Sequence, residues 1–184
     1  MPRPPSGGSG AARDRDGGPP SAPPVSLGYN APVNLPPLVR ALRPEQWLKN
    51  GFVVAPLVFS GRVTEPEAWL PCAVAVVGFC AASSATYLVN DLIDREVDRQ
   101  HPEKRLRPVA SGQVGVGLAS VTTAMLMLVA FATAVVLGLQ FALALGGYLA
   151  LTTVYSLGLK HAVFVDVMVV AAGFVLRVVG GAVA

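Results

Sequence analysis

The chain has 184 residues, of which 53% are hydrophobic and only 14% are charged, and its mean hydropathy is +0.55. This is the composition of a membrane protein. The formal net charge of +3 comes without a basic stripe interleaved with aromatic residues, which excludes a nucleic-acid-binding protein. Cys72 and Cys80 lie in an apolar stretch, where we expect them to pack and not to form a disulfide or a metal pair.

The first 37 residues differ sharply from the remainder of the chain. They contain ten of the 16 prolines, together with many glycine and serine residues. Such a segment cannot bury enough apolar surface to fold, and it has no apolar run long enough for a signal peptide. We therefore predict a disordered tail over residues 1–37 and one all-α, integral membrane domain over residues 38–184.

The first two predicted membrane spans differ in length. Only 12 uncharged residues separate Lys49 from Arg62, so the first span is short, and its helix is expected to begin near Pro44 and to kink at Pro56. The second span covers about residues 67–90 and includes 23 consecutive uncharged residues, which is enough to cross a bilayer.

Three further spans bring the predicted total to about five. The 52 uncharged residues from Pro108 to Leu159 accommodate two spans joined by a turn at residues 138–140. A polar segment at residues 155–166 precedes the fifth span. Basic residues concentrate on one side of this arrangement, and Arg62 is almost alone on the other. The positive-inside rule makes the basic side the cytoplasmic face of a plasma-membrane protein.

The strongest functional signal follows the second span directly. Asp91, Asp94 and Asp98 fall within a narrow arc of one helix face, where carboxylates repel one another unless a cation lies between them. Oxygen ligands of this kind suit Mg²⁺ and substrate phosphates. On an ideal helix Asp91 and Asp98 are about 10 Å apart, which requires either two ions or a bend. The alternative is a solvated helix end whose acids are neutralised by Arg95 and Arg99.

A second polar group, Tyr155, Lys160 and Asp166, lies between the fourth and fifth spans and is predicted to face the same compartment as the aspartates. Tyr and Lys at such positions also serve as ordinary interface residues. Asp166 stands in an otherwise apolar run, where a carboxylate is usually paired or functional. Arg177 lies deeper on the same helix and should face the bundle interior, paired with an acid or with backbone carbonyls.

Three cations, Lys104, Arg105 and Arg107, lie on the loop between these two groups. Three cations near three aspartates suit a Mg²⁺–polyphosphate ligand, with the metal between the carboxylates and the basic side chains on the outer phosphate oxygens. The alternative is positive charge that only sets the membrane topology, and composition does not decide between the two.

The motifs resemble those of the UbiA-type superfamily of membrane prenyltransferases. The resemblance rests on Asn-Asp-x-x-Asp-x-x-x-Asp at residues 90–98 and on the Tyr/Lys/Asp group. Arg-Pro-x-Gln-Trp-x-Lys-Asn at residues 43–50 and Lys-Arg-x-Arg-Pro at residues 104–108 are closest to the branch that includes decaprenyl-phosphate phosphoribosyltransferase. The resemblance implies an all-α bundle of about nine spans around a cavity open to lipid, of which this chain would hold the N-terminal five.

The resemblance also implies a reaction. The donor would be phosphoribosyl pyrophosphate and the acceptor a polyprenyl (decaprenyl) phosphate, whose oxygen attacks ribose C1 to make a precursor of cell-envelope arabinan. The three aspartates would hold Mg²⁺ and so neutralise the leaving pyrophosphate, while Tyr155, Lys160 and Asp166 would orient the ribose phosphate or a second metal. The implied substrate-binding residues are Lys49, Asn90, Lys104, Arg105 and Arg107.

Three other interpretations stay open. The same fold can use a prenyl diphosphate donor with an aromatic or lipid acceptor, and the aspartates would then ionise the prenyl group. A transporter or channel would need acidic residues near midspan, whereas these aspartates lie at a span end. A chain with about half of the family's spans is also compatible with an inactive, non-catalytic membrane fragment.

Overall fold

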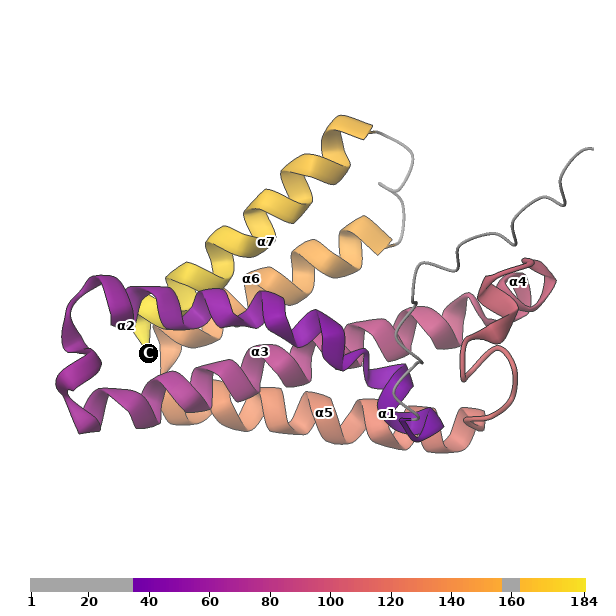
Figure 1. Cartoon of the computed structure of the whole chain (residues 1–184), viewed down its shortest axis with the longest axis horizontal. Coiled ribbons are helices and arrows are strands. Elements are labelled where there is room, and N and C mark those ends of the chain that lie inside the picture. Colours follow the sequence, from indigo (N-terminus) through magenta and orange to yellow (C-terminus); the bar gives the residue numbers. More distant parts are fainter. Residues whose placement is uncertain (1–34, 157–162) are drawn as a thin grey trace, which may run out of the picture. The chain divides into compact units, whose positions relative to one another are not determined.

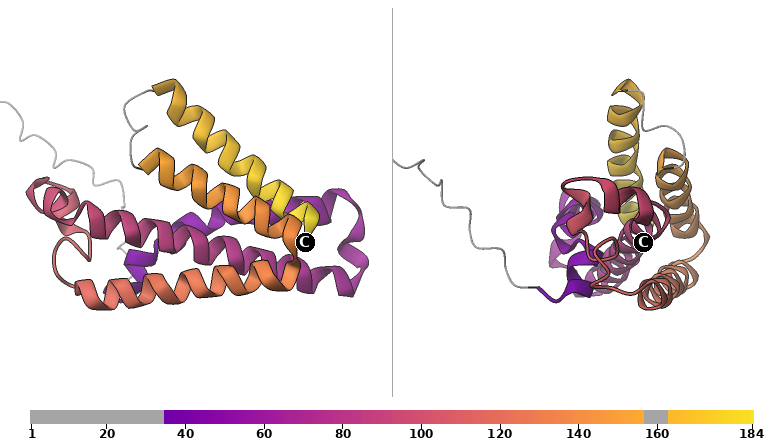
Figure 2. Two further views of the ribbon diagram at one scale, coloured as in Figure 1. Left: turned by 180° about the vertical axis from the view of Figure 1, so that it is seen from behind. Right: turned by 90° about the vertical axis from the view of Figure 1, so that its right-hand side faces the viewer.

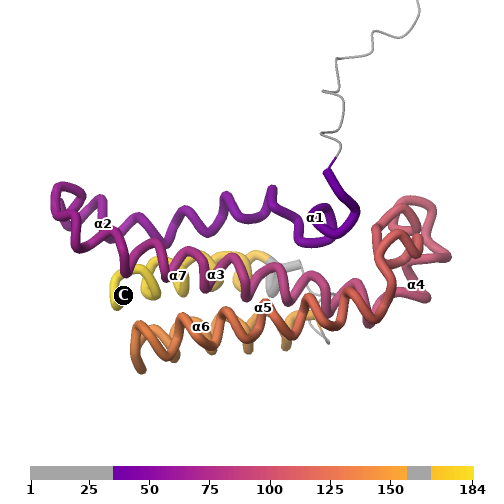
Figure 3. Tube along the Cα trace, turned by 90° about the horizontal axis from the view of Figure 1, so that it is seen from below, coloured from indigo at the N-terminus to yellow at the C-terminus, as the bar shows by residue number. Residues whose placement is uncertain are grey.

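The computed structural model describes residues 35–156 and 163–184. For residues 163–166 it describes the backbone and not the side chains. Within these residues every regular element is a helix, in agreement with the all-α class (Figure 1). α3 (Pro66–Ile93) lies between the first segment of the chain and α5 (Val116–Leu137), and it contacts both (Figure 3). α6 (Leu139–Val154) packs against α7 (Val163–Val183).

The first segment contains a helix that begins at Pro44, as expected, but it is a 3₁₀-helix and it is not kinked at Pro56. A short α1 (Pro37–Leu42) is followed by an 11-residue 3₁₀-helix, η1 (Pro44–Val54), and then by α2 (Ala55–Phe59). Pro56 lies in the first turn of α2, where proline removes no intrahelical hydrogen bond, so it begins a helix and does not kink one. A 3₁₀-helix rises about 2.0 Å per residue, so η1 alone is about 22 Å long.

The 3₁₀ geometry sorts the side chains of η1 into rows, because residues three apart lie on the same face. One row faces α3. The Trp47 indole donates to Ser84 Oγ at 2.9 Å, and Asn50 and Val53 are completely buried. η1 can therefore pack along α3 although it is not an α-helix.

A second row of η1 faces α7. Phe52 packs edge-on against Phe174 with the ring centroids 4.8 Å apart, and Lys49, one 3₁₀ turn earlier, lines a cavity that α7 also borders. η1 thus contacts α3 with one face and α7 with another.

α3 is the central helix, and its 28 residues make it about 42 Å long. Phe79 is completely buried and packs edge-on against Phe141 and Tyr148 of α6, with ring centroids 5.8 and 5.5 Å away. Small residues on the same helix allow close approach of α5, since a side chain at Gly78 would run into Thr133. This aromatic and small-residue core holds α3, α5 and α6 together.

α3 ends sooner than a continuous helix through the aspartates would. Asp94 has φ −82° and ψ 1°, and α4 (Arg95–Gln100) begins after it in a new direction (Figure 2). A short 3₁₀-helix, η3 (Lys104–Leu106), then leads into the loop before α5. The bend places α4 and η3 at the end of α3.

The turn expected at residues 138–140 consists of Gly138 alone, because Leu139 already begins α6. Gly138 has φ 91°, a conformation that glycine adopts without strain. Within the described residues, α3 and α5 are long and apolar enough to cross a membrane, whereas α6 and the apolar part of α7 are shorter. The count of about five spans stays a prediction.

Only 11% of the most apolar 18-residue stretch of α5 is buried, so this helix presents apolar side chains on the outside of the bundle. At the other side of the bundle, α7 crosses η1 closely. A Cβ atom on Gly181 would collide with the backbone carbonyl of Val53, so glycine is required there.

Candidate active site

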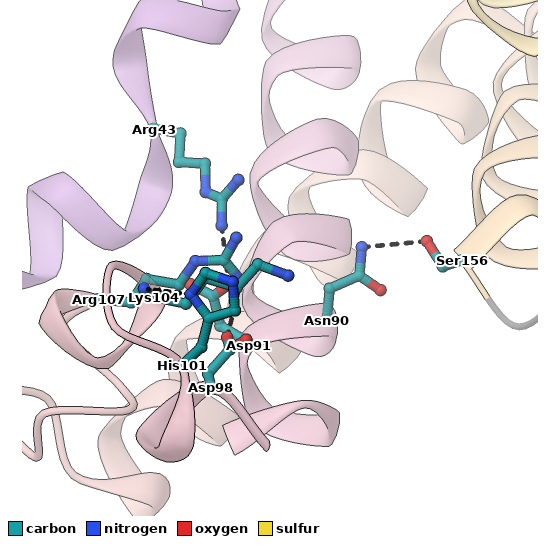
Figure 4. A network of polar contacts seen from close by, with 8 residues as sticks. All are labelled: Arg43, Asn90, Asp91, Asp98, His101, Lys104, Arg107 and Ser156. Carbon is teal, nitrogen blue, oxygen red and sulfur yellow. Dashed lines mark hydrogen bonds and ion pairs between the residues drawn. The ribbon is translucent and has the colours of Figure 1, made fainter. Parts of the chain in front are cut away.

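Two of the three predicted aspartates meet at the end of α3 (Figure 4). Asp91 Oδ1 accepts hydrogen bonds from Arg43 Nη2 at 2.8 Å and from Arg107 Nη1 at 3.3 Å. The same nitrogen of Arg107 lies 2.7 Å from Asp98 Oδ2. Arg43 joins α1 to η1, and Arg107 follows η3, so three separate segments converge on these carboxylates.

The bend at Asp94 lies between Asp91 on α3 and Asp98 on α4, and Arg107 contacts both carboxylates. Because one nitrogen of Arg107 reaches both, Asp91 Oδ1 and Asp98 Oδ2 are at most about 6 Å apart, the sum of the two distances. An unbroken helix would separate the two residues by about 10 Å along its axis. Of the two alternatives that the spacing left open, two ions or a bend, the structure shows the bend.

Both carboxylates are only 2% exposed, whereas the side chains of Arg43 and Arg107 are 24% and 30% exposed. A buried charge is stable only when it is paired, and loss of one partner of a buried pair costs about 3–5 kcal/mol. The Arg43 guanidinium also lies 4.6 Å from the ring centroid of Tyr87, which fixes its direction. The site is therefore a neutralised, buried cluster whose basic side is accessible.

The interpretation of a solvated helix end with Arg95 and Arg99 as counter-ions is wrong for Asp91 and Asp98. Arg95 and Arg99 instead form ion pairs with Glu96, at 3.4 and 3.1 Å. Asp91 and Asp98 are buried, and their cations come from two other segments of the chain.

The donor chemistry of the cluster fits Mg²⁺, which prefers carboxylate oxygens. Asp91 Oδ2 and Asp98 Oδ1 take no part in the ion pairs with Arg43 and Arg107. Among the described residues, however, no three Asp, Glu, His or Cys side chains form a group that could hold a metal. The role of Asp91, Asp94 and Asp98 as a set of metal ligands accordingly stays a prediction.

The loop cations do not act as one group. Arg107 belongs to the aspartate cluster, whereas Lys104 and Arg105 are exposed on η3. The Arg105 side chain donates to the carbonyl of Pro102 at 3.2 Å, and His101 Nδ1 accepts the backbone N–H groups of Glu103 and Lys104. Lys104 and Arg105 form no ion pair with the described carboxylates, so their part in substrate binding stays a prediction.

The second predicted group is only partly described. Lys160 and the side chain of Asp166 lie outside the described residues. Tyr155 ends α6 and lines a cavity that Asn90 also lines, and Asn90 Nδ2 donates to Ser156 Oγ at 3.1 Å (Figure 4). The end of α6 therefore lies against the aspartate end of α3, which supports the prediction that both groups face one side.

The cavity has a volume of about 190 Å³ and is bordered by η1, α3, α6 and α7. Lys49 lines it and is not among the described ion-pair partners of Asp91 and Asp98. Arg177 lines it as well and is 7% exposed. The prediction that Arg177 faces the bundle interior is confirmed, and its Nη1 donates to the backbone carbonyl of Gly173 at 2.9 Å.

Arg43 was not among the site residues predicted from the sequence. The signal was present, since Arg43 begins the Arg-Pro-x-Gln-Trp-x-Lys-Asn motif. Ser156, which fixes Asn90, was also missed. A single serine beside Tyr155 gave no comparable signal.

A model of the UbiA prenyltransferase family matches residues 52–184. The chain belongs to the UbiA prenyltransferase family. Membership of this family of integral membrane transferases agrees with the helical bundle and with the two helices that are long and apolar enough to span a bilayer.

Among curated relatives, a decaprenyl-phosphate phosphoribosyltransferase of Corynebacterium glutamicum is 39% identical over 151 residues, which cover 80% of this chain and 46% of the relative. The protein of the same name from Mycobacterium tuberculosis is 41% identical, with 80% and 50% covered. The chain thus spans about half the length of the curated relatives that it matches. A solved UbiA homologue from Archaeoglobus fulgidus, bound to DMAPP and Mg²⁺, has a TM-score of 0.64 and 27% identity, covering 79% of this chain and 53% of that one.

Proposed function

We propose that the protein transfers the 5-phosphoribosyl group of phosphoribosyl pyrophosphate to a polyprenyl phosphate, such as decaprenyl phosphate, in the membrane. The observation that carries the proposal is the buried Asp91–Arg107–Asp98 cluster in a chain that is about 40% identical to decaprenyl-phosphate phosphoribosyltransferases. Two carboxylates and two arginines in one place supply ligands for a metal and for the phosphates that it binds.

Each residue of the cluster has a role in this reaction. Asp91 and Asp98, with Asp94, would hold Mg²⁺, which supplies neutralisation of the pyrophosphate leaving group. Arg43 and Arg107 would exchange their carboxylate partners for phosphate oxygens of the donor, because guanidinium groups bind phosphate in two-pronged geometry. This exchange keeps every buried charge paired throughout.

The reacting groups would meet beside Asn90 and Tyr155. An oxygen of the acceptor phosphate bonds to ribose C1 while the bond from C1 to pyrophosphate breaks, and the bonding electron pair leaves with pyrophosphate. Asn90, whose Nδ2 donates to Ser156 Oγ, would orient the ribose together with Tyr155. Lys160 and Asp166 would complete this orientation, and Lys49, Lys104 and Arg105 would supply further phosphate contacts.

The site would face the cytoplasm from the plasma membrane. Arg43 and Arg107 lie at the Asp91 end of α3, whereas Arg62 lies just before its opposite end at Pro66. The concentration of basic residues at the Asp91 end supports a cytoplasmic position for that end. A water-soluble donor would then have direct access to the arginines.

The test is transfer of a radiolabelled phosphoribosyl group to decaprenyl phosphate in membranes that contain the protein, with and without Mg²⁺. Asp91→Asn is expected to lower Mg²⁺-dependent transfer on the order of a hundredfold or more. Glu65→Gln is the matched control, because Glu65 also pairs with an arginine, Arg62 at 2.7 Å, but at the other end of α3 and exposed. Full transfer by well-folded Asp91→Asn protein would remove the aspartate from the mechanism.

A second candidate is transfer of a prenyl group from a prenyl diphosphate to an aromatic or lipid acceptor. It is favoured by the solved homologue from Archaeoglobus fulgidus, which contains DMAPP and Mg²⁺. Parallel incubation with phosphoribosyl pyrophosphate and with a labelled prenyl diphosphate separates the two reactions. Turnover of only the prenyl diphosphate would assign the protein to this second reaction.

A further inference from the structure

Arg177 is a buried cation with only neutral partners among the described residues. Its Nε donates to Asn50 Oδ1 at 2.7 Å, and its Nη2 donates to the Tyr148 hydroxyl at 3.1 Å. Its Nη1 donates to the Gly173 carbonyl, as described above. Among the described side chains, no carboxylate forms an ion pair with Arg177. The positive charge of Arg177 is thus not neutralised by the described part of the chain.

The guanidinium also retains hydrogen-bonding capacity. Arginine has five N–H bonds, and three of those of Arg177 are engaged by Asn50, Gly173 and Tyr148. One N–H on Nη1 and one on Nη2 have no acceptor among the described residues. A pair of donors on the two terminal nitrogens matches two oxygens of one phosphate group.

The cavity in front of Arg177 is bordered by cationic and hydroxyl-bearing side chains as well as by apolar ones. Two of its described lining residues, Lys49 and Arg177, are cations, and none of those lining residues is an acid. Its 190 Å³ corresponds to about six water molecules, which suits a small sugar phosphate and not a long polyprenyl chain. Residues with hydroxyl groups, among them Ser83, Tyr87 and Ser156, are also part of its lining.

The cavity connects Arg177 with the aspartate end of the bundle. Asn90, which is next to Asp91, and Arg177 both line it. Asn50 accepts a hydrogen bond from Arg177 and donates one to Ser83 Oγ at 3.3 Å. Ser83 lies eight residues before Asp91, which is about 12 Å along α3. A pentose that carries phosphate groups at both ends can bridge such a separation.

We propose that Arg177 binds a phosphate monoester at the inner end of this cavity, with Lys49 and the hydroxyl groups around the attached polyol. The proposal rests on the proposed function, in which the donor carries pyrophosphate at C1 and a phosphate at C5. The pyrophosphate lies at Asp91 and Asp98, and the 5-phosphate reaches Arg177. The phosphate of the lipid acceptor has the same chemistry, so the experiment has an arm for each source.

The experiment measures equilibrium binding of ribose 5-phosphate to the protein in lipid nanodiscs without Mg²⁺, so that the aspartates do not contribute through a metal. Arg177→Gln is expected to weaken binding by about ten- to a hundredfold, because charged hydrogen bonds to phosphate are lost. Arg177→Lys retains the charge but not the two-pronged geometry, so its affinity for ribose 5-phosphate is expected to lie between those of the wild-type protein and Arg177→Gln. Binding of Mg²⁺–pyrophosphate should stay unchanged in both variants. Arg62→Gln, an exposed arginine far from the cavity, is the matched control.

A second arm repeats the titration with a short polyprenyl phosphate. If Arg177→Gln weakens this ligand and not ribose 5-phosphate, Arg177 binds the acceptor phosphate. Wild-type affinity for both ligands in a folded Arg177→Gln protein overturns the proposal. Circular dichroism and gel filtration establish folding; if the glutamine variant does not fold, wild-type affinity in Arg177→Lys is the overturning result.

Failure of the proposed function gives a different result. If wild-type protein with Mg²⁺ does not bind phosphoribosyl pyrophosphate, the proposed function fails, and so does the assignment of the donor 5-phosphate to Arg177. If the wild-type protein binds this donor and the Arg177 variants bind ribose 5-phosphate equally well, only the proposal for Arg177 fails.

Discussion

Arg43 and Asp91 connect the first segment of the chain to the end of α3, with Nη2 of Arg43 2.8 Å from Oδ1 of Asp91. Arg43 has φ 54°, in the left-handed region that residues with a side chain rarely adopt. This backbone conformation ends α1, begins η1 and directs the guanidinium at Asp91. One residue therefore sets both the path of the chain and the charge balance of the candidate site.

Replacement of Arg43 by glutamine is expected to lower the free energy of unfolding by about 1–3 kcal/mol, the cost of an unmade hydrogen bond at a buried charged group. The loss stays below that of a fully unpaired charge, because Arg107 still contacts Asp91. Unfolding in detergent with increasing SDS measures the change. Arg40→Gln is the control, since the Arg40 side chain is exposed and donates a hydrogen bond to the neutral Gln113. Equal stability of both variants would show that the Arg43–Asp91 pair contributes nothing.

Chelation of Mg²⁺ is expected to leave the stability of the ligand-free protein unchanged, because Arg43 and Arg107 already neutralise Asp91 and Asp98. Binding of phosphoribosyl pyrophosphate should be lost under the same conditions, since the metal would bridge donor and carboxylates. SDS titration and calorimetric binding, each with and without EDTA, measure the two effects. A large drop in stability on chelation would indicate a structural metal and contradict the prediction.

Gly181→Ala and Gly146→Ala are expected to have opposite outcomes. A methyl group at Gly181 meets the Val53 carbonyl, and such overpacking costs about 1–3 kcal/mol. Gly146 has no neighbouring atom within 4 Å of an added Cβ, so alanine there should be neutral or slightly stabilising in the helix. The unfolding midpoints of the two variants check the contrast. A tolerated alanine at position 181 would mean that α7 does not cross η1 as closely as described.

Features with a local cause were predictable from the sequence. The extent of α3 follows from an uncharged stretch that ends at Asn90, and the turn at Gly138 follows from glycine between two apolar stretches. The inward position of Arg177 follows from the cost of a charge in an apolar helix. Each of these inferences needs only the residue and its sequence neighbours.

Features that depend on distant partners were not predictable in the same way. Asp91 is neutralised by Arg43, 48 residues before it, and no spacing rule identifies such a partner. The bend at Asp94 was one of two alternatives, because the helical period alone does not show where a helix stops. The 3₁₀ form of η1 was not predicted from the sequence. Its two rows of contacts, toward α3 and α7, depend on tertiary packing.

The 3₁₀ form of η1 makes the first segment sensitive to register in a particular way. Each residue turns the helix by about 120°, so one inserted residue would move Asn50 from α3 to another face and separate it from Arg177. Insertion of three residues would shift the segment along its axis but return every side chain to its own face. Insertions in this segment should therefore be tolerated in steps of three residues. The α-helices beside it have 3.6 residues per turn, so three inserted residues would not restore their faces.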